Sequence, residues 1–187
     1  MEWAAGVTDQ HICILPTSLE QEAEANLIFE WNRKMAKPDF TPLLQPGMHS
    51  LTLAQLHDLA VAPFEEDVKR LELFQKLSVW AEAVQAAGIR GQLWVDGSFL
   101  TEKDEPGDID CILWSPRWED PSFNTPDSNA QLSRLFDHAH AEAIYGLDFY
   151  LEMPTPDQIF HREAYWRGIL GFCHDRVTAK GFAEITL

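Results

Sequence analysis

The chain has 187 residues, 45% of them hydrophobic, which suffices for one folded domain with a substantial core. Its 14 Lys and Arg residues against 30 Asp and Glu residues give a formal net charge of −16, and this excess argues against general nucleic-acid binding because phosphate backbones are repelled. No stretch predicts a membrane span, and the N-terminus lacks the basic start and long apolar run of a signal peptide, so we expect a cytoplasmic protein.

The three cysteines, Cys13, Cys111 and Cys173, lie in apolar surroundings and include no CxxC pair. An odd number of cysteines without such a pair argues against a disulfide framework. We therefore expect free, buried thiols in a reducing compartment.

The first 46 residues are interrupted by four prolines and predict an N-terminal arm with one helix. The helix is expected over residues 18–35, where Ser18 and Gln21 have the spacing of a capping box. Residues 47–187 are expected to form the main domain.

Two helices are predicted at the start of this domain. Thr52 is the expected cap of the first, over residues 52–60, in which leucines recur at helical spacing. The second is expected over residues 65–87, before Gly88, which favours a helix end. Its apolar residues recur every three or four positions: Val68, Leu71, Phe74, Leu77, Ala81 and Val84.

The rest of the domain alternates strands with helices. Runs of residues suited to a buried sheet predict strands at 92–95, 108–114, 147–153 and 181–187. Apolar spacing predicts a helix over residues 132–143 that Gly146 ends, and a capping pattern at Thr155 predicts another over residues 156–170. This order indicates an α/β or α+β fold, with a small mixed β-sheet flanked by helices.

Five carboxylates and one lysine crowd into residues 102–110, where a loop meets a predicted strand. Such crowding favours a bound cation. Side chains alternate along a strand, so Asp108 and Asp110 are expected to share one face. Two hard oxygen ligands suit Mg²⁺, whereas the stretch from Asp104 lacks the glycine and the closing glutamate of a Ca²⁺-binding EF-hand loop.

Upstream, Asp96, Gly97 and Ser98 lie where a predicted strand turns. Glycine lets a backbone approach a ligand closely, and a serine hydroxyl with free amide groups can bind phosphate oxygens. Nine residues separate Ser98 from Asp108, and a third acid, Asp148, lies between two apolar residues on the next predicted strand. The spacing therefore predicts one site built from these segments.

This pattern of Gly-Ser, Asp-Ile-Asp and Leu-Asp-Phe resembles the nucleotidyltransferase superfamily, which includes polymerase beta, the aminoglycoside nucleotidyltransferases and the small bacterial minimal nucleotidyltransferases. The stretches WVDGSFLTEKDEPGDIDCILW and GFCHDRVTAKGFAEITL also resemble a bacterial family of uncharacterised nucleotidyltransferase-like proteins, over roughly residues 47–187. The resemblance implies a nucleotidyltransferase-like domain there.

By this resemblance, Gly97 and Ser98 bind the triphosphate of a nucleoside triphosphate, and Asp108, Asp110 and Asp148 are the catalytic residues and metal ligands. Asp148 also assists the attacking hydroxyl. The implied cofactor is Mg²⁺, with Mn²⁺ as the alternative. The implied reaction transfers a nucleoside monophosphate to a hydroxyl of a protein, RNA or small-molecule acceptor and releases pyrophosphate.

The minimal nucleotidyltransferases that neutralise toxins suggest a toxin–antitoxin or defence context, as an analogy with that family. The acidic net charge argues against nucleic acid and leaves a basic protein as the expected partner. The competing interpretation is a non-catalytic, antitoxin-like interaction module whose acidic surface binds a basic protein.

Other side chains leave alternatives open. Glu152 shares the predicted strand face of Asp148 and is a second candidate for the third acid. Phe99, next to Ser98, is the one aromatic residue to test for contact with the nucleotide. His138 and His140 lie two apart on a predicted helix and face different ways, so a shared metal is not expected there.

Overall fold

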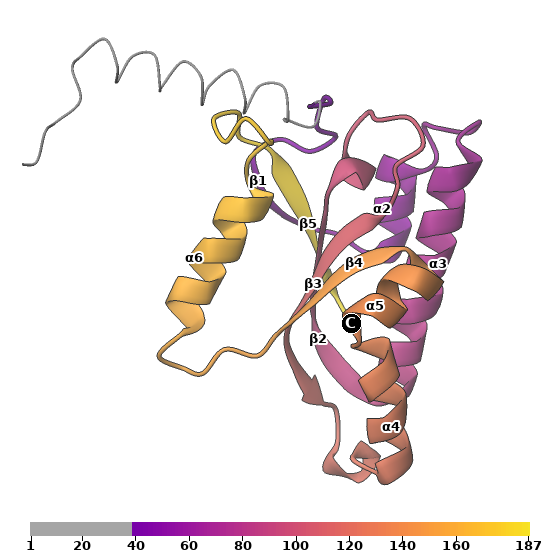
Figure 1. Ribbon diagram of the computed structural model, residues 1–187, viewed down its shortest axis with the longest axis vertical. Coiled ribbons are helices and arrows are strands. Elements are labelled where there is room, and N and C mark those ends of the chain that lie inside the picture. The colour runs from indigo at the N-terminus through magenta and orange to yellow at the C-terminus, as the bar shows by residue number, and fades with distance from the viewer. Residues whose placement is uncertain (1–38) are drawn as a thin grey trace, which may run out of the picture. The chain divides into compact units, whose positions relative to one another are not determined.

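The structure, a computed structural model, describes residues 39–187, so the predicted helix at residues 18–35 lies outside the described residues. Helices cover both faces of an open, mixed five-stranded sheet (Figure 1). The strand order is β1-β5-β2-β3-β4. This arrangement confirms the predicted fold class, while the predicted boundary between an arm and a domain at residue 46 stays a prediction.

The central strands of the sheet combine antiparallel and parallel pairing. β2 pairs antiparallel with both β3 and β5, whereas β3 pairs parallel with β4 and β5 pairs parallel with β1. Four of the strands confirm predictions, and β1 was not predicted because a four-residue edge strand is too short to show an alternating pattern. The strands are β1 (Gly47–Ser50), β2 (Ile89–Asp96), β3 (Ile109–Trp118), β4 (Leu147–Glu152) and β5 (Gly181–Thr186).

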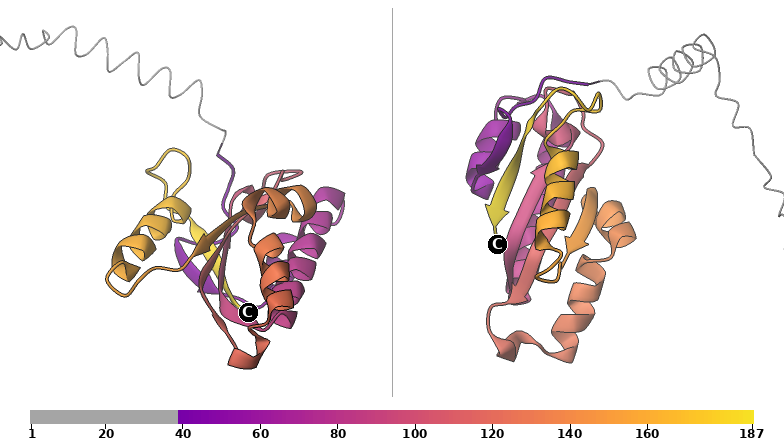
Figure 2. Two further views of the ribbon diagram at one scale, coloured as in Figure 1. Left: turned by 60° about the horizontal axis from the view of Figure 1, so that its bottom comes forward. Right: turned by 90° about the vertical axis from the view of Figure 1, so that its left-hand side faces the viewer.

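The helices are divided unequally between the two faces of the sheet. α6 lies alone on one face, and the other helices lie on the opposite face (Figures 1 and 2). The helices are α2 (Leu53–Ala60), α3 (Val68–Ala86), α4 (Pro126–Leu135), α5 (His138–His140) and α6 (Ile159–Leu170). Short 3-10 turns occur at Ser98–Leu100 and Pro121–Phe123, and a π-helical turn at Ala141–Tyr145.

Local capping starts α2 and α3 near the predicted positions. The Thr52 side chain accepts a hydrogen bond from the backbone N–H of Gln55 at 3.1 Å, and the Gln55 side chain accepts one from the Thr52 N–H at 2.9 Å. Asp67 caps α3 by accepting a hydrogen bond from the backbone N–H of Arg70 at 2.9 Å. The chain leaves α3 through Gly88, whose φ of +83° confirms the predicted helix end.

The buried face of α3 differs from the simple apolar pattern. Val68 and Leu71 are 75% and 40% exposed, whereas Arg70 is fully buried. Because α3 carries apolar residues on more than one side, packing against the sheet, rather than periodicity, selects the face that is buried.

The single helix predicted over residues 132–143 is wrong, because the chain breaks into α4 and α5. α4 ends at Leu135, whose carbonyl oxygen accepts a hydrogen bond from Trp80 Nε1 at 2.9 Å. Asp137 then caps α5 by accepting a hydrogen bond from the His140 N–H at 2.8 Å. A capping carboxylate at this position favours a new helix start over continuation. Gly146 ends the segment as predicted, with a φ of +66°.

The start predicted for α6 is also wrong. α6 begins at Ile159, and the Thr155 side chain does not cap it. Instead, the backbone N–H of Thr155 donates to Gln158 Oε1 at 3.4 Å, and the intervening residues form a turn. Thr155 and Gln158, the predicted capping-box pair, therefore stabilise a turn that precedes α6 and do not cap the first turn of the helix.

Two apolar clusters stabilise the described residues. The larger fills the space between the sheet and the helices α2, α3 and α4 with the π-helical turn. The smaller joins α6 to the other face of the sheet through Trp94, Ile112, Trp166, Leu170 and Phe182. In residues 39–187, no helix has the length and apolar character needed to cross a membrane.

Candidate functional site

Three aspartates from three neighbouring strands form one row on the α6 face of the sheet. Asp96 at the end of β2 is paired in register with Asp110 of β3, and Asp110 is paired in register with Asp148 of β4. Residues directly opposite one another on paired strands place their side chains on the same face, with Cβ atoms about 5 Å apart. We call Asp96, Asp110 and Asp148 the carboxylate row. The register therefore brings two predicted site residues together and adds Asp96, which had been noted only as part of the turn.

Asp108 lies outside this row. β3 begins at Ile109, one residue later than predicted, so Asp108 is the last residue of the preceding loop and is exposed. Strand alternation therefore does not extend to Asp108. Its predicted role as a metal ligand stays a prediction.

Gly97 allows the loop after β2 to pass against the carboxylate row. Its φ is +82°, and a Cβ atom on Gly97 would clash with the carboxylate of Asp110. Only glycine satisfies both conditions at no steric cost. Ser98 follows at the start of the 3-10 turn, and its carbonyl oxygen accepts a hydrogen bond from the Thr101 hydroxyl at 2.8 Å. The predicted phosphate loop is thus adjacent to Asp110.

Phe99, the aromatic residue singled out for a test of nucleotide contact, does not line this site. Its side chain is fully buried in the larger core cluster, on the face away from α6. The 3-10 turn directs the Phe99 ring into the core, whereas the preceding residues, Gly97 and Ser98, remain half-buried.

A buried arginine holds the loop that follows Gly97. The guanidinium group of Arg70 is completely buried and donates hydrogen bonds to four backbone carbonyl oxygens. These oxygens belong to Ala60 at 3.1 Å, Phe99 at 2.6 Å, Thr101 at 3.0 Å and Lys103 at 2.6 Å. Arg70 was not predicted, because the sequence shows only one basic residue within an apolar helical pattern.

Asp67 completes this support. Its Oδ2 atom lies 3.5 Å from Arg70 Nε and accepts a hydrogen bond from the Glu105 N–H at 2.9 Å. Although burial opposes ionisation of Asp67, hydrogen bonds from the backbone N–H groups of Arg70 and Glu105 hold the pKa of Asp67 below its ordinary value. Asp67 and Arg70 therefore attach both ends of residues 99–105 to the start of α3.

Lys180 forms an ion pair with Asp96, the most buried member of the carboxylate row. Its Nζ atom lies 2.7 Å from Asp96 Oδ2, and both side chains are largely buried. Burial raises the pKa of Asp96 to about 7; Lys180 opposes this rise, and the charge of Asp110 adds to it. Asp96 Oδ1 is buried and has no hydrogen-bond partner among the described residues. Lys180 precedes β5, far along the chain, so no local motif indicates this contact.

His138 and Tyr150 flank Asp148 at the other end of the row. His138 Nδ1 lies 2.9 Å from the Phe149 carbonyl oxygen and 3.7 Å from Asp148 Oδ1. Burial, followed by the charge of Asp148 and a hydrogen bond to it, raises the pKa of the Tyr150 hydroxyl. His140 makes no such contact with Asp148 in the described structure. The structure thus separates the two histidines, as their spacing predicted.

The pKa of His138 offers a direct check of this geometry. The hydrogen bond to the Phe149 carbonyl, and then the charge of Asp148, raise the pKa of His138 above its ordinary value near 6.5. We expect the Asp148→Asn variant to show a lower His138 pKa than the wild-type protein, because one of these two contributions is lost. An NMR titration of the imidazole protons measures the change. An unchanged pKa would contradict the contact between the two side chains.

Glu152, the alternative third acid, is engaged elsewhere. It is buried and forms an ion pair with Arg162 of α6, whose Nε donates to Glu152 Oε2 at 3.1 Å. Hydrogen bonds from Arg162 hold the pKa of Glu152 below its ordinary value despite burial. Glu152 therefore attaches α6 to β4 and does not extend the carboxylate row.

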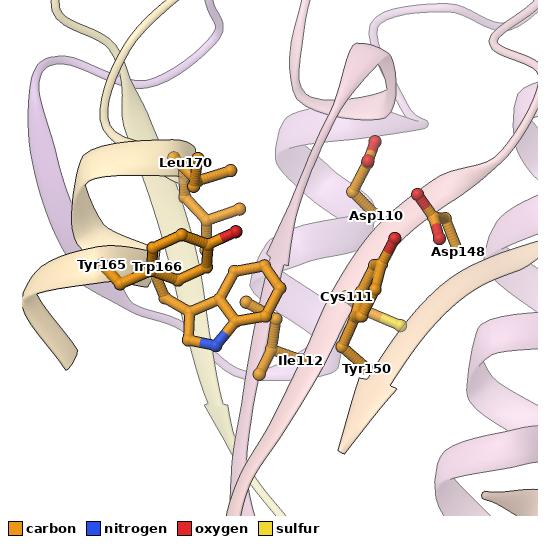
Figure 3. Close-up of a pocket in the computed structure, with 9 residues that line it drawn as sticks. Asp110, Cys111, Ile112, Asp148, Tyr150, Tyr165, Trp166 and Leu170 are labelled. Carbon is orange, nitrogen blue, oxygen red and sulfur yellow. The ribbon is translucent and has the colours of Figure 1, made fainter. Parts of the chain in front are cut away.

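A pocket with a cavity volume of about 210 Å³ opens beside the carboxylate row, between α6 and strands β3 and β4. Figure 3 shows Asp110 and Asp148 side by side at one end, with the Tyr150 hydroxyl directed toward them. The pocket is lined by Asp110, Cys111, Ile112, Asp148, Tyr150, Tyr165, Trp166, Ile169 and Leu170. The α6 residues among these were not predicted, because their approach depends on how α6 packs.

Within residues 39–187, no three His, Cys, Asp or Glu side chains lie close enough together to hold a metal ion by themselves. The paired carboxylates of Asp110 and Asp148 offer hard oxygen ligands from two adjacent strands. Mg²⁺ often binds through only one or two carboxylates and completes its octahedral shell with water and substrate phosphates. The donor set therefore fits Mg²⁺ together with a phosphorylated ligand better than Mg²⁺ alone.

A model of a protein family, described as a family of unknown function (DUF6932), matches residues 38–186 of the chain. The match includes every described strand and helix, and its description assigns no chemistry to them. Neither curated proteins nor solved structures gave a match.

Proposed function

Because the chain belongs to DUF6932, a family of unknown function, we propose from the geometry of its site that it is a magnesium-dependent nucleotidyltransferase. It would transfer a nucleoside monophosphate from a nucleoside triphosphate to an acceptor hydroxyl. The observation that carries this proposal is the register of β3 and β4, which pairs Asp110 with Asp148 beside the Gly97–Ser98 loop.

Asp110 and Asp148 are the proposed metal ligands, and the exposed Asp108 is available as a third from the loop. Mg²⁺, or Mn²⁺ in its place, would neutralise phosphate charge and orient the α-phosphate for in-line displacement. Asp96 contributes in a different way, since its buried carboxylate is already bound to Lys180. Its unpartnered Oδ1 atom supports a further polar ligand near this end of the row.

The Gly97–Ser98 loop is the proposed triphosphate site. Backbone N–H groups in a glycine turn and a serine hydroxyl are suitable donors to phosphate oxygens. Arg70 holds the following residues through their carbonyl oxygens, which restricts the loop before the ligand binds. Lys180, adjacent to Asp96, adds positive charge where the chain as a whole is strongly acidic.

Asp148 is the proposed proton acceptor for the attacking hydroxyl, with His138 beside it at 3.7 Å. Attack forms a bond between the acceptor oxygen and the α-phosphorus and breaks the bond to pyrophosphate, which leaves. The hydroxyl proton passes to Asp148 and then to solvent. A basic protein is the acceptor class that the net charge of −16 favours.

The test is calorimetric titration of each of the four ribonucleoside triphosphates into the full chain, with Mg²⁺ and with excess chelator. We expect at least one nucleotide to bind with Mg²⁺ and none to bind without a divalent cation, because the carboxylate row repels uncompensated phosphate. Mn²⁺ should replace Mg²⁺. Label placed on the α-phosphate would then follow transfer to a co-purified protein, RNA or small molecule.

A matched control is the Asp58→Asn variant, which removes an exposed carboxylate from α2, far from the row in the sequence and on the other face of the sheet. It should bind nucleotides as the wild-type protein does. If no nucleotide binds under any of these conditions, the proposal is wrong. The acidic, non-catalytic module that binds a basic protein would then be the better interpretation.

A further inference from the structure

The pocket beside the carboxylate row has a wall of three contacting aromatic rings. The Tyr150 and Trp166 ring centroids lie 5.2 Å apart, and those of Tyr165 and Trp166 lie 5.1 Å apart. Trp166 is only 8% exposed and forms the base of this wall, whereas Tyr150 and Tyr165 are 41% and 51% exposed at its rim. Figure 3 shows that Tyr165 and Trp166 come from α6 and Tyr150 comes from β4. The Trp166 ring is inclined by 50° to Tyr150 and by 76° to Tyr165, so a flat group can stack on one exposed ring while it contacts the others at an angle.

The position of this wall is fixed by contacts outside the pocket. Arg162 joins α6 to Glu152 of β4, and its guanidinium group lies 5.0 Å from the Tyr165 ring centroid. Trp166 itself packs in the smaller core cluster. The pocket is therefore largely formed before any ligand arrives, which lowers the entropic cost of binding.

Among residues 39–187, the pocket has no cationic side chain that would bind a phosphate group directly. Its polar groups include the carboxylates of Asp110 and Asp148, the hydroxyl groups of Tyr150 and Tyr165 and the buried Nε1 of Trp166, and no Lys or Arg lines the pocket in the described part of the chain. Phenol oxygens accept hydrogen bonds from N–H groups, while the two carboxylates are the proposed metal ligands. A flat, uncharged ring that carries N–H donors fits this set better than an anion.

The spacing along the strands relates this wall to the proposed phosphate site. Ile112 and Tyr150 lie two residues beyond Asp110 and Asp148 on the same strand faces, which corresponds to a separation of roughly 7 Å. One sugar unit spans a similar distance between the α-phosphate and the base of a nucleotide. A phosphate at the carboxylate row would therefore bring the attached base to the aromatic wall.

We propose that this pocket is a nucleobase subsite, in which the base of the bound nucleotide stacks on the exposed ring of Tyr165 and contacts Trp166 and Tyr150 at an angle. The assignment rests on the proposed function for the nature of the ligand, but its aromatic residues are different from the proposed metal ligands. It replaces Phe99, which is buried, as the source of aromatic contact with the nucleotide.

Nucleosides, which lack phosphates, test the subsite separately from the metal site. We expect adenosine, guanosine, cytidine or uridine at millimolar concentration to receive saturation transfer from the full-length protein in NMR experiments without Mg²⁺, with base protons more strongly saturated than ribose protons. The Tyr165→Ala variant should weaken this binding by roughly tenfold, as expected for the loss of one stacked ring. Tyr165→Phe should retain it, because the ring is kept.

Phe160→Ala is the matched control, because Phe160 is a 76% exposed ring on the same helix that does not line the pocket. It should bind nucleosides as the wild-type protein does. If no nucleoside binds the wild-type protein, or if Tyr165→Ala and Phe160→Ala have equal effects, the subsite assignment is overturned.

Parallel titrations with Mg²⁺ and either a nucleoside triphosphate or inorganic tripolyphosphate distinguish the two proposals. Tyr165→Ala should weaken binding of the nucleoside triphosphate and leave tripolyphosphate binding unchanged. Magnesium-dependent nucleotide binding that is insensitive to Tyr165→Ala would overturn the subsite and leave the proposed function standing. Nucleoside binding without any magnesium-dependent binding of triphosphates would support the subsite and contradict the proposed function.

Discussion

The Asp110→Asn variant is expected to lose roughly 30-fold or more in magnesium-dependent affinity for nucleoside triphosphates, or about 2 kcal/mol. Asp110 lies at the centre of the carboxylate row, paired with Asp96 on one side and Asp148 on the other, so its charge acts on any cation bound there. The protein should remain folded, because the charge of Asp110 also adds to the rise in the pKa of buried Asp96, and its removal relieves that repulsion. Calorimetry measures the affinity, and thermal unfolding checks the fold.

The Asp108→Asn variant, measured in the same way, separates the two acids of the Asp-Ile-Asp motif. The resemblance to nucleotidyltransferases implies that both bind metal, whereas the structure includes only Asp110 in the row. A loss of affinity in both variants would assign the exposed loop carboxylate to the metal site as well. Unchanged affinity in Asp110→Asn, with Asp58→Asn as the control, would contradict the metal site itself.

Replacing Arg70 with Met is expected to lower the free energy of unfolding by about 3–5 kcal/mol. The change leaves three carbonyl oxygens of residues 99–103 and that of Ala60 without their donor, and it leaves Asp67 without its partner. Each buried group that loses its hydrogen bond costs about 1–3 kcal/mol before relaxation. Urea unfolding of the variant and the wild-type protein measures the difference.

Lys76→Met on the same helix is the control. Lys76 forms an exposed ion pair with Glu72 at 2.7 Å, and such i, i+4 pairs contribute only about 0.3–0.5 kcal/mol. Arg70→Lys, which keeps the charge but has fewer donors, should fall between the two variants. A loss below about 1 kcal/mol in Arg70→Met would show that the hydrogen bonds of Arg70 do not hold this loop.

Much of the fold follows from local patterns. Thr52 and Gly88 mark helix boundaries that the structure confirms, because capping and a left-handed turn depend on only a few neighbouring residues. Asp137 shows where such patterns fail. Apolar spacing continues across it, yet its carboxylate caps a new helix, and the chain divides there into α4 and α5. Competing local signals of this kind are decided by packing, such as the hydrogen bond from Trp80 to Leu135.

The sequence by itself determined the order of four of the five strands, the fold class, and a candidate site at Gly97, Ser98, Asp108, Asp110 and Asp148. These depend on periodicity, capping and motif spacing, which are properties of short segments. Only the tertiary structure decided which side chains share the site. Strand register added Asp96 to the row, burial excluded Phe99, and packing of residues distant in the chain brought in Arg70 and Lys180. Register, burial and long-range contacts are set by the whole core, so no local segment of the chain encodes them.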